Sequence, residues 1–474
     1  MKFIVQGDLP HHDIQTMAQV FFHRIGFDLI SEPPKDGLCL HMQRKGRAIK
    51  AILYENNIAI DKFNAQIDFD DDSSVCRATK LAVYAILTAY TKHRPPWGLL
   101  TGIRPTKIAA SLLAEGFSDK QIQHKLKTHH LVDHSRAALC TQIAQMQKYI
   151  LDDSVSPKDA VSIYISIPFC PSICHYCSFS GYPADKYTKH MYGYITALIK
   201  EIEYLGQLCR DKYIENIYIG GGTPTALDDV NFVRLLTTVS KHLMADKAFE
   251  YTIEAGRPDT ITNEKLALMR RYGASRISIN PQTLNDATLT KIGRQHTSAQ
   301  FIRAYKMAQD SGFDNINIDL ILGLPDETLD DVYRTLDGIV ELNPKSCTIH
   351  TLSVKRASKM HQDKEIHSIS QMSDMLLASR AYMDSLSLEP YYMYRQKNSL
   401  GNYENVGYAS LGYACHYNIQ IMEEKQTIYA AGAGAITKLV DIESGRIERV
   451  FNLRNPVEYI EKVDEMIERK KRQV

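Results

Sequence analysis

The sequence predicts an α/β fold built around an incomplete parallel barrel, (β/α)6, with a smaller α+β domain before it and an α+β extension after it. Six short runs rich in β-branched or aromatic residues alternate with helical segments in the middle of the chain. About 25 to 55 residues separate the centres of successive runs, which leaves room for one helix between strands. Strands that alternate with helices in this way form parallel sheets, and six such units predict a barrel that does not close.

Residues 1–155 are expected to form the amino-terminal accessory domain. Short β-like runs, including Lys2–Gln6 and Ala51–Tyr54, come first, and helical spacing follows from about Val75. Two loops rich in Pro and Gly interrupt the helical part. We place the end of this domain in the polar segment 152–159, which contains a proline.

The predicted barrel occupies residues 156–388. Its six strands are Ser162–Ile167, Asn216–Ile219, Tyr251–Ile253, Arg276–Ile279, Asn315–Leu320 and Cys347–His350. The loops that follow parallel strands meet at the carboxyl edge of the sheet, so functional residues collect there.

Residues 389–474 form the predicted carboxy-terminal domain, which is rich in tyrosine. We expect most of these rings to pack as core. Cys415 and His416 could ligate haem iron, although such a pair is usually structural. The segment Ala431–Ala435 permits close approach to the backbone. Glu461–Lys471 is charged all round and predicts a solvated helix.

Composition excludes several classes of protein. The chain has 474 residues, of which 44% are hydrophobic and 23% charged, as in ordinary globular proteins. Its 56 Lys and Arg against 55 Asp and Glu give a net charge of +1, which supplies no broad field for nucleic acid. We expect no membrane span and no nucleic-acid partner. Nine cysteines without the apolar run of a signal peptide indicate the cytoplasm.

The first predicted strand runs directly into three cysteines, Cys170, Cys174 and Cys177, in the spacing C-x3-C-x2-C. Three thiolates around one centre select an iron–sulfur cluster, Zn²⁺ or Cu⁺. A structural zinc site normally needs four ligands, and only His175 is nearby. Three thiolates on a four-iron cluster leave one iron open, where a small molecule can be activated.

The ends of the next strands carry further polar and glycine residues. Gly220–Thr223 follows the second strand, and its glycines let a ligand approach the backbone. Glu254 and Gln282 follow the third and fourth strands and could hydrogen-bond to a bound ligand or simply cap the strands. Arg294 could hold a carboxylate, or it could pair with Asp319, which would be costly in a buried strand without a partner.

The cysteine triad in this strand-end context resembles the radical S-adenosylmethionine superfamily. The resemblance implies a 4Fe-4S cluster whose open iron is chelated by S-adenosyl-L-methionine, which is cleaved to give a 5′-deoxyadenosyl radical. Tyr176 matches the aromatic residue usually found between the second and third cysteines. Glycines like Gly220–Gly222 bind the amino group of S-adenosylmethionine in this superfamily.

The order of the motifs more closely resembles one family, the oxygen-independent coproporphyrinogen III oxidases, also called dehydrogenases. The matching segments are Tyr164–Cys170, Gly220–Thr225, Glu254, Pro281–Gln282, Gly293–Thr297 and Asn317–Pro325. Carried over from the family, Cys170, Cys174 and Cys177 are cluster ligands. The resemblance implies S-adenosylmethionine contacts at Tyr164, Gly221, Gly222, Thr223, Glu254, Gln282, Arg294 and Asp319. The loop 94–107 and the sequence Glu254–Asp259 resemble the HemZ-type branch.

The resemblance implies oxidative decarboxylation of coproporphyrinogen III to protoporphyrinogen IX in anaerobic haem biosynthesis, with an electron donor such as flavodoxin or ferredoxin. One departure concerns Phe179, which stands where well understood members have a fourth cysteine. Relatives that handle haem also lack that cysteine. A haem-binding chaperone, or a radical enzyme that degrades haem, is therefore the alternative. Cationic candidates for the substrate carboxylates, chosen by charge alone, are Arg94, Arg104, Lys107, Lys355 and Arg356. No catalytic residue is assigned.

Overall fold

The computed structural model describes residues 1–473 except 23–24, 70, 103, 154–159, 178–180, 245–246, 354–359, 361–370 and 397–401. The described residues form two compact units. The first contains residues 1–145 and 395–404, and the second contains residues 146–394 and 405–474. Domain boundaries near residues 155 and 388 remain our proposal.

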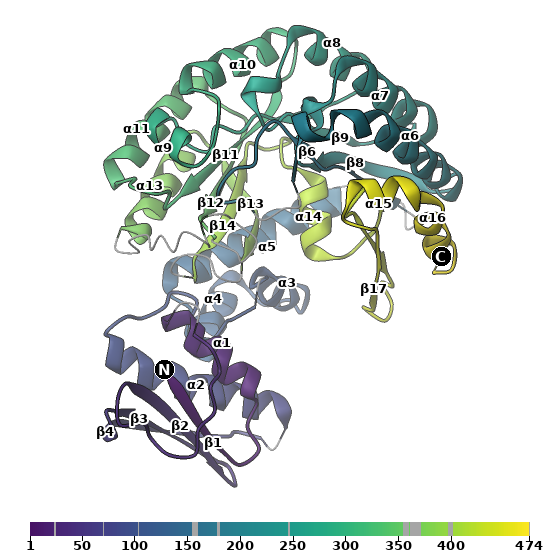
Figure 1. Cartoon of the computed structure of the whole chain (residues 1–474). Helices are drawn as coiled ribbons and strands as arrows, with labels where there is room; N and C mark the ends of the chain where they lie inside the picture. The colour runs from purple at the N-terminus through teal and green to yellow at the C-terminus, as the bar shows by residue number, and fades with distance from the viewer. Residues whose placement is uncertain are drawn as a thin grey trace. The chain divides into compact units, whose positions relative to one another are not determined.

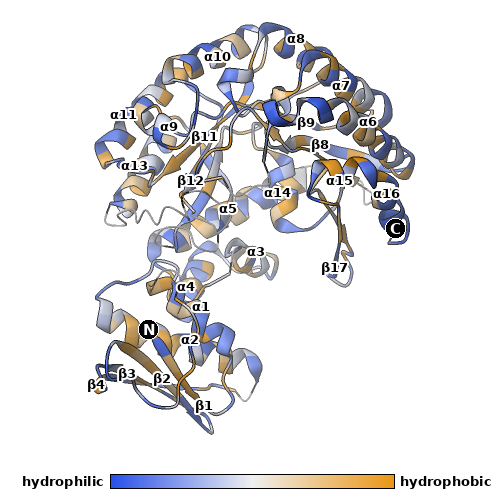
Figure 2. Ribbon diagram, in the orientation of Figure 1, coloured by the Kyte–Doolittle hydropathy of each residue, from blue (hydrophilic) through white to orange (hydrophobic). Residues whose placement is uncertain are grey.

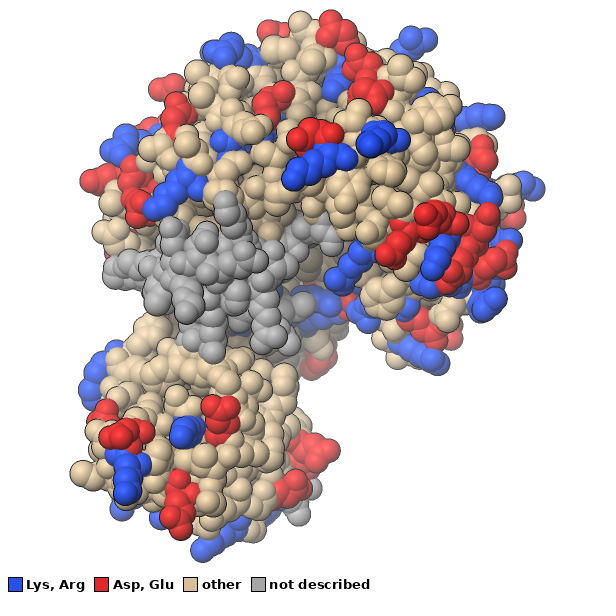
Figure 3. Space-filling view, viewed as in Figure 1, with Lys and Arg blue, Asp and Glu red and all other residues tan. Residues whose placement is uncertain are grey.

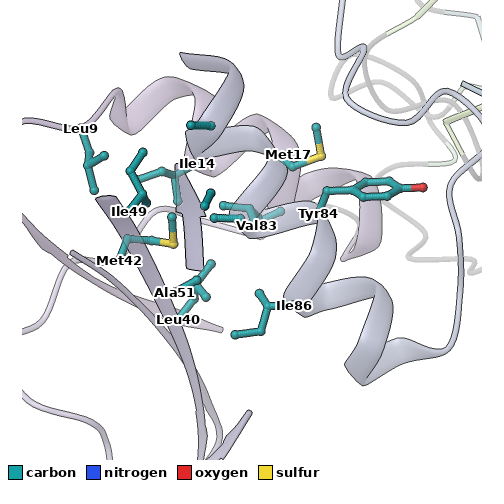
Figure 4. Packing of buried hydrophobic residues seen from close by; sticks show 14 of the residues in the cluster. Leu9, Ile14, Met17, Leu40, Met42, Ile49, Ala51, Val83, Tyr84 and Ile86 are labelled. Carbon is teal, nitrogen blue, oxygen red and sulfur yellow. The ribbon is translucent and has the colours of Figure 1, made fainter. Parts of the chain in front are cut away.

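The first unit is built on a four-stranded sheet in the order β1-β2-β3-β4. Its strands are β1 (Lys2–Gln6), β2 (Leu38–Lys45), β3 (Ala48–Glu55) and β4 (Ile58–Gln66). β1 is parallel to β2, and the other neighbours are antiparallel. Helices α1 (His11–Phe21) and α2 (Asp72–Thr91) contribute to the same hydrophobic core as the sheet (Figure 4). Three more helices follow: α3 (Thr106–Ala114), α4 (Asp119–His129) and α5 (His134–Asp153), and the division between the two units falls within α5.

Simple sequence patterns account for these elements. In β3, Ile49, Ala51 and Leu53 alternate with more exposed residues, so one face of the strand enters the core. α2 begins at an Asp71 cap, whose carboxylate accepts a hydrogen bond from the Ser74 N–H at 2.8 Å. The two predicted interruptions by Pro and Gly both lie between α2 and α3, and the second of them runs into the first residues of α3, which begins at Thr106.

The second unit contains an eleven-stranded sheet in the order β13-β14-β12-β11-β10-β9-β8-β5-β15-β16-β17. Its six central strands are β5 (Ala160–Ile167), β8 (Tyr213–Gly221), β9 (Glu250–Glu254), β10 (Arg276–Ser278), β11 (Asn315–Leu322) and β12 (Ser346–Thr351). Each is parallel to the next, in chain order. The predicted α/β fold with six parallel strands is confirmed, and the sheet forms a curved, open arrangement (Figure 1).

The remaining strands extend both sides of this parallel sheet. They are β13 (Glu389–Arg395), β14 (Glu404–Ala409), β15 (Thr427–Ala431), β16 (Ile436–Val440) and β17 (Ile447–Phe451). β15 continues the parallel sheet beside β5, whereas β14 is antiparallel to β12. A separate short pair, β6 (Phe169–Cys170) and β7 (Tyr182–Pro183), lies just after β5.

Helices follow most of the strands and cover the convex side of the sheet (Figure 1). They are α6 (Ala184–Leu208), α7 (Asp229–Leu243), α8 (Asn263–Arg271), α9 (Asp286–Lys291), α10 (Ser298–Asp310), α11 (Leu329–Leu342) and α13 (Met372–Ser385), with the short η1 (Pro224–Ala226) and η2 (Pro258–Thr260). The carboxy-terminal part adds α14 (His416–Glu423), α15 (Pro456–Glu461) and α16 (Val463–Lys471). Figure 2 shows hydrophilic residues on the outer sides of these helices and apolar residues along the strands.

The two faces of the parallel sheet differ in chemistry. Ile163, Ile165 and Ile167 lie on one face of β5, and the corresponding positions of the neighbouring strands are also apolar and buried. The other face is polar or aromatic. Its residues, in register from strand to strand, include Ser162, Tyr164, Ser166, Asn216, Tyr218, Thr252, Glu254, Arg276, Ser278, Asn317, Asp319, Thr348 and His350. Closed barrels of this general type usually fill their interior with branched apolar residues, so the polar face marks a functional interior.

The carboxy-terminal helix corrects one prediction. The segment Glu461–Lys471 is not a solvated helix, because Val463, Met466, Ile467 and Lys470 of α16 are buried. The Lys470 ammonium lies 2.5 Å from a carboxylate oxygen of Glu201 in α6, and both side chains are completely buried. A buried glutamate requires such a partner, and 269 residues separate the two in sequence.

No helix among the described residues has the length and apolar character needed to cross a membrane. On the face drawn in Figure 3, Lys and Arg are interspersed with Asp and Glu.

Candidate functional site

The three predicted cluster cysteines lie in one loop at the carboxyl end of β5. Strand β5 ends at Ile167. Cys170 lies in the short strand β6, which pairs with β7. A turn closed by the Cys177 N–H and the Cys174 carbonyl, 3.0 Å apart, brings the second and third cysteines together. All three side chains are partly exposed, and no disulfide joins them.

The thiol of Cys170 is far from ionised in this environment. Burial raises the pKa of Cys170, the Thr223 hydrogen bond opposes this increase, and the neighbouring Cys177 and Cys174 sulfurs add to it, so that the pKa is about 11. A thiolate is therefore favourable here only when a cation compensates for the loss of water. Metal binding supplies that compensation, which fits the chemistry expected of the loop.

A glycine turn covers the first cysteine. Gly221 has φ +111°, a conformation that L-residues rarely adopt, and its N–H lies 3.2 Å from a carboxylate oxygen of Glu254. A Cβ at Gly222 would come within 2.6 Å of the Phe169 carbonyl and 3.0 Å of the Cys170 sulfur. The Thr223 hydroxyl lies 3.7 Å from the same sulfur. Only a residue without a side chain fits at Gly222, directly beside the cysteine loop.

Glu254, at the end of β9, lies beside the glycine turn. Its carboxylate accepts a hydrogen bond from the Tyr218 hydroxyl at 2.6 Å. Burial raises the pKa of Glu254 to about 7, although the hydrogen bond from Tyr218 acts in the opposite direction. The carboxyl group can therefore gain or lose a proton near neutral pH, or bind a cationic group of a ligand.

Gln282 and Asp319 lie side by side after β10 and in β11. The Gln282 N–H donates to the Asp319 carbonyl at 3.1 Å, and Gln282 adopts the left-handed region with φ +71°. Its side-chain oxygen is buried without a hydrogen-bond partner. An orphaned acceptor of this kind is costly unless a ligand donates to it, which fits the predicted role of Gln282.

The Asp319 carboxylate is held by two neighbours. The Asn317 amide donates to it at 2.7 Å, and His350 Nε2 lies 3.7 Å away. Burial alone would raise the pKa of Asp319, but the hydrogen bonds and charge of His350 and Asn317 hold it below its usual value. The other nitrogen of His350 lies 3.2 Å from the Tyr394 hydroxyl, so a chain of polar groups crosses the sheet interior.

Arg294 does not pair with Asp319 as the ligand-free alternative predicted. Its guanidinium donates to the carbonyls of Gly256 and Asn280 and to the Tyr176 hydroxyl, at 3.1, 3.1 and 3.0 Å. Tyr176, predicted from the aromatic position between the cysteines, is thereby anchored to the opposite side of the site. The Nε of Arg294 is buried without a partner.

Stacked tyrosines line the polar face of the sheet, below the carboxyl edge at which the cysteine loop lies. Tyr164 stacks on Tyr218 with ring centroids 6.2 Å apart, and the Tyr417 ring from α14 lies 4.5 Å from Tyr218. Tyr417 belongs to the predicted tyrosine core, as do the buried Tyr391 and Tyr392. Their positions place aromatic surface beside the polar residues of the central strands.

The described part of the site does not provide the ligands for a single metal ion. Among the described residues, no three Cys, His, Asp or Glu side chains are close enough to hold one ion. A four-iron cluster differs, because each thiolate binds a different iron and the sulfurs stay farther apart. Three thiols, the glycine beside Cys170 and the orphaned Gln282 oxygen fit a cluster with an additional ligand.

Four residues that contact the predicted site residues were not among the sequence predictions: Tyr218, Arg257, Asn317 and His350. The signal for three of them was present, because polar residues occupy every second position of the predicted strands. Arg257, which contacts the cysteine loop, carried no such signal.

Cys415 and His416, the predicted haem-ligating pair, are not part of this site. Cys415 is completely buried and its thiol lies 3.2 Å from a Glu250 carboxylate oxygen, while the His416 ring packs 4.5 Å from Phe249. Arg94, Arg104 and Lys107 belong to the first unit. Phe179, Lys355 and Arg356 lie outside the described residues.

The class of protein is defined by a family model described as the radical SAM superfamily, which matches residues 164–339. The chain is also 36% identical over 481 residues to the oxygen-independent coproporphyrinogen-III oxidase-like protein HemZ of Bacillus subtilis, with 98% of this chain and 96% of the relative covered. The chain therefore belongs to the family of oxygen-independent coproporphyrinogen-III oxidase-like proteins, within the radical S-adenosylmethionine superfamily. The suspected relationship is confirmed, and with it the 4Fe-4S cluster and S-adenosylmethionine as the cofactors of this family.

Two further relatives add detail. The haem chaperone HemW of Lactococcus lactis is 29% identical over 318 residues, covering 66% of this chain and 79% of the relative. The solved structure of coproporphyrinogen III oxidase (HemN) from Escherichia coli, a radical SAM enzyme, has a TM-score of 0.52 and 22% sequence identity. It covers 68% of this chain and 73% of HemN, and it supports the fold.

Proposed function

We propose that this protein is a radical S-adenosylmethionine oxidoreductase that converts coproporphyrinogen III to protoporphyrinogen IX. The observation that carries the proposal is the combination at one sheet edge of the cysteine loop, the glycine turn and Glu254, above a polar and aromatic sheet face. The full-length relationship to HemZ supports the same assignment. Tetrapyrroles carry both aromatic or apolar ring surface and carboxylates, and this face offers partners for each.

In this proposal Cys170, Cys174 and Cys177 hold the cluster. The bound cofactors supply a radical that removes a hydrogen atom from the substrate. Contacts with S-adenosylmethionine come from Tyr164, Tyr176, Gly221, Gly222, Thr223, Glu254, Gln282, Arg294 and Asp319. Gly221 and Gly222 keep the backbone accessible, Gln282 offers its unpaired oxygen, and Glu254 and Asp319 offer carboxylates.

The reaction balances at each of two propionate groups. The β-carbon would give one hydrogen atom to the cofactor-derived radical, which becomes 5′-deoxyadenosine. The substrate would then release carbon dioxide and pass one electron to an external one-electron acceptor, leaving a vinyl group. A low-potential protein such as flavodoxin or ferredoxin delivers the electron that starts each cycle. We place the reaction in the cytoplasm, because the chain has nine cysteines and none of them is joined in a disulfide.

The test is an anaerobic assay of cluster-loaded protein with S-adenosylmethionine, a reductant and coproporphyrinogen III, followed by mass spectrometry. We expect two carboxyl groups to be lost from the tetrapyrrole, and 5′-deoxyadenosine to form with them. Cys174→Ala should abolish both products, whereas Cys209→Ala, which changes a cysteine outside the loop, provides the matched control. If 5′-deoxyadenosine forms while the tetrapyrrole stays intact, the proposed substrate is wrong.

A haem carrier is the second candidate, favoured by the similarity to a protein named haem chaperone HemW. Haem binding would then occur without turnover of the tetrapyrrole. Titration with haem, followed by its Soret absorption, tests this function. The buried Cys415 thiol donates a hydrogen bond to Glu250 and is not available to a haem iron. A Cys415→Ala variant should therefore retain any haem binding. Decarboxylated product in the assay above would contradict the carrier.

A further inference from the structure

Arg257 is a buried arginine that reaches the cysteine loop from the end of β9, two strands away from β5 in the sheet. It follows β9 and immediately precedes η2. Only 3% of its surface is exposed. A guanidinium keeps its charge under ordinary conditions, so burial at this depth requires well-placed partners.

The partners of Arg257 include two residues of the cysteine loop. Its Nη1 donates to the Ser172 carbonyl at 3.1 Å and lies 3.9 Å from the Cys174 sulfur. Both terminal nitrogens lie 3.1 Å from the Ser172 hydroxyl oxygen, which in turn donates to the Gly293 carbonyl at 3.1 Å. One side chain therefore fixes the loop between the first two cysteines and places a positive charge beside the second.

Asp259 holds the other side of the guanidinium. Its two carboxylate oxygens accept from Nε and Nη2 at 3.1 and 3.2 Å. The Arg257 backbone is also fixed, because its carbonyl accepts from the Thr260 hydroxyl at 2.8 Å. Thr260 in turn lies 2.7 Å from the hydroxyl of Thr225, next to the glycine turn.

We propose that Arg257 is a positioning residue for the cysteine loop and that its guanidinium raises the reduction potential of the cluster. Reduction adds a negative charge to the cluster, and part of that charge resides on the cysteine sulfurs. A cationic N–H donor beside Cys174 stabilises the reduced form more than the oxidised form.

Arginine suits this position better than lysine. Its planar fork binds Asp259 with two nitrogens while Nη1 remains directed at Ser172 and Cys174. A lysine ammonium would keep the charge but could not make both sets of contacts. Charge and geometry can therefore be separated by substitution.

The experiment measures the midpoint potential of the cluster by anaerobic redox titration, using electron paramagnetic resonance of the reduced form. It requires no tetrapyrrole, so its outcome is independent of the proposed substrate. In Arg257→Met we expect a more negative midpoint, with the reduced-to-oxidised ratio at the wild-type midpoint falling about tenfold, or about 59 mV for one electron. Arg257→Lys should shift less in the same direction.

Asp259→Asn provides the opposite test, because it removes the negative charge that compensates Arg257. We expect its midpoint to become more positive. The matched control is Arg271→Met, which removes the charge of an exposed arginine on α8 and should leave the midpoint unchanged.

Iron and sulfide content must be measured beside each titration. A purely structural role for Arg257 would lower cluster content without moving the potential of the clusters that remain, and that result would overturn the proposal. If Arg257→Met holds no cluster, Arg257→Lys and Asp259→Asn decide the question. Midpoints that shift in opposite directions support the proposal, and two unchanged midpoints contradict it.

Discussion

The two large sheets of this protein use the same alternation of side chains for different purposes. In the first unit, the β3 residues that alternate inward are Ile49, Ala51 and Leu53, which join the helices in a hydrophobic core. In the second unit, the face of β5 that carries Ile163 and Ile165 is equally apolar. Its opposite face, however, carries tyrosines, carboxylates, amides and a histidine that contact one another.

This difference separates residues that fold the chain from residues that act on a ligand. Polar groups away from water reduce stability unless every donor and acceptor is satisfied. In the second unit many of these groups satisfy each other, while several buried side-chain atoms, among them the Gln282 oxygen and the Arg294 Nε, have no hydrogen-bond partner. Such positions are where a bound cofactor or substrate contributes most, and where substitution should affect function more than folding.

The largest expected effect is the loss of the cluster from the cysteine loop. Cys174→Ala removes one of three proposed thiolate ligands, and we expect loss of the iron–sulfur absorption and of at least about 1,000-fold in activity, or more than about 4 kcal/mol of transition-state stabilisation. Iron analysis and visible spectroscopy measure the result. Cys347→Ala, in a buried strand of the same unit, is the comparison. Full iron content in Cys174→Ala would show that this cysteine is not a ligand.

The second prediction concerns Glu201–Lys470, an ion pair of the second unit in which both side chains are completely buried. Lys470→Met leaves the Glu201 carboxylate buried with only the neutral partners Asn452, Tyr459 and the Gly432 N–H. We expect the free energy of unfolding to fall by about 3 to 5 kcal/mol.

Tryptophan fluorescence can show which of the two units loses stability in Lys470→Met. The only tryptophan of the chain, Trp97, belongs to the first unit. In urea, Lys470→Met should shift the circular-dichroism transition of the second unit while the tryptophan fluorescence transition stays in place. Leu40→Ala, in the first core, should do the reverse. Equal shifts of both signals in both variants would mean that the two units unfold together.

Much of this organisation was predictable from the sequence, for identifiable reasons. The six strands are short and β-branched, and the cysteine triad directly follows the first, so both follow from local residue order. The roles of Arg257 and Lys470 depend on partners far away in the chain, Ser172 and Glu201, which no local pattern indicates. The polar face could have been inferred, because Ser162, Tyr164 and Ser166 alternate with isoleucines.

The third prediction is a pH dependence that arises from Glu254. Burial raises its pKa from 4.5 to about 7, so the folded protein binds this proton more tightly than the unfolded chain. The protonated form stabilises the fold fully below pH 4.5, and that contribution is lost as pH rises to about 7. At about 1.4 kcal/mol per pKa unit, the loss approaches about 3 kcal/mol.

In protein without added S-adenosylmethionine, Glu254→Gln should reduce the fall in the free energy of unfolding between pH 4.5 and about 7. Denaturant unfolding at several pH values between 4.5 and 7.5 measures the slope. Glu327 also has a pKa raised to about 7 by burial, so Glu327→Gln should remove a separate part of the slope. The exposed Glu341→Gln is the control. If the free energy of unfolding of Glu254→Gln depends on pH as it does in the wild type, Glu254 is ionised throughout pH 4.5 to 7.5.

The smallest expected effect concerns an exposed ion pair of the first unit. It tests whether burial, rather than charge alone, makes an ion pair important for stability. Asp68 in the first unit pairs with Arg77 at 3.3 Å, but its side chain is 56% exposed. Water already solvates both charges there, so Asp68→Asn should reduce stability by less than about 1 kcal/mol, and less still at high salt. Tryptophan fluorescence in urea measures this change directly in the unit that contains the pair. A loss comparable to that of Lys470→Met would show that burial is not what makes the Glu201–Lys470 pair important.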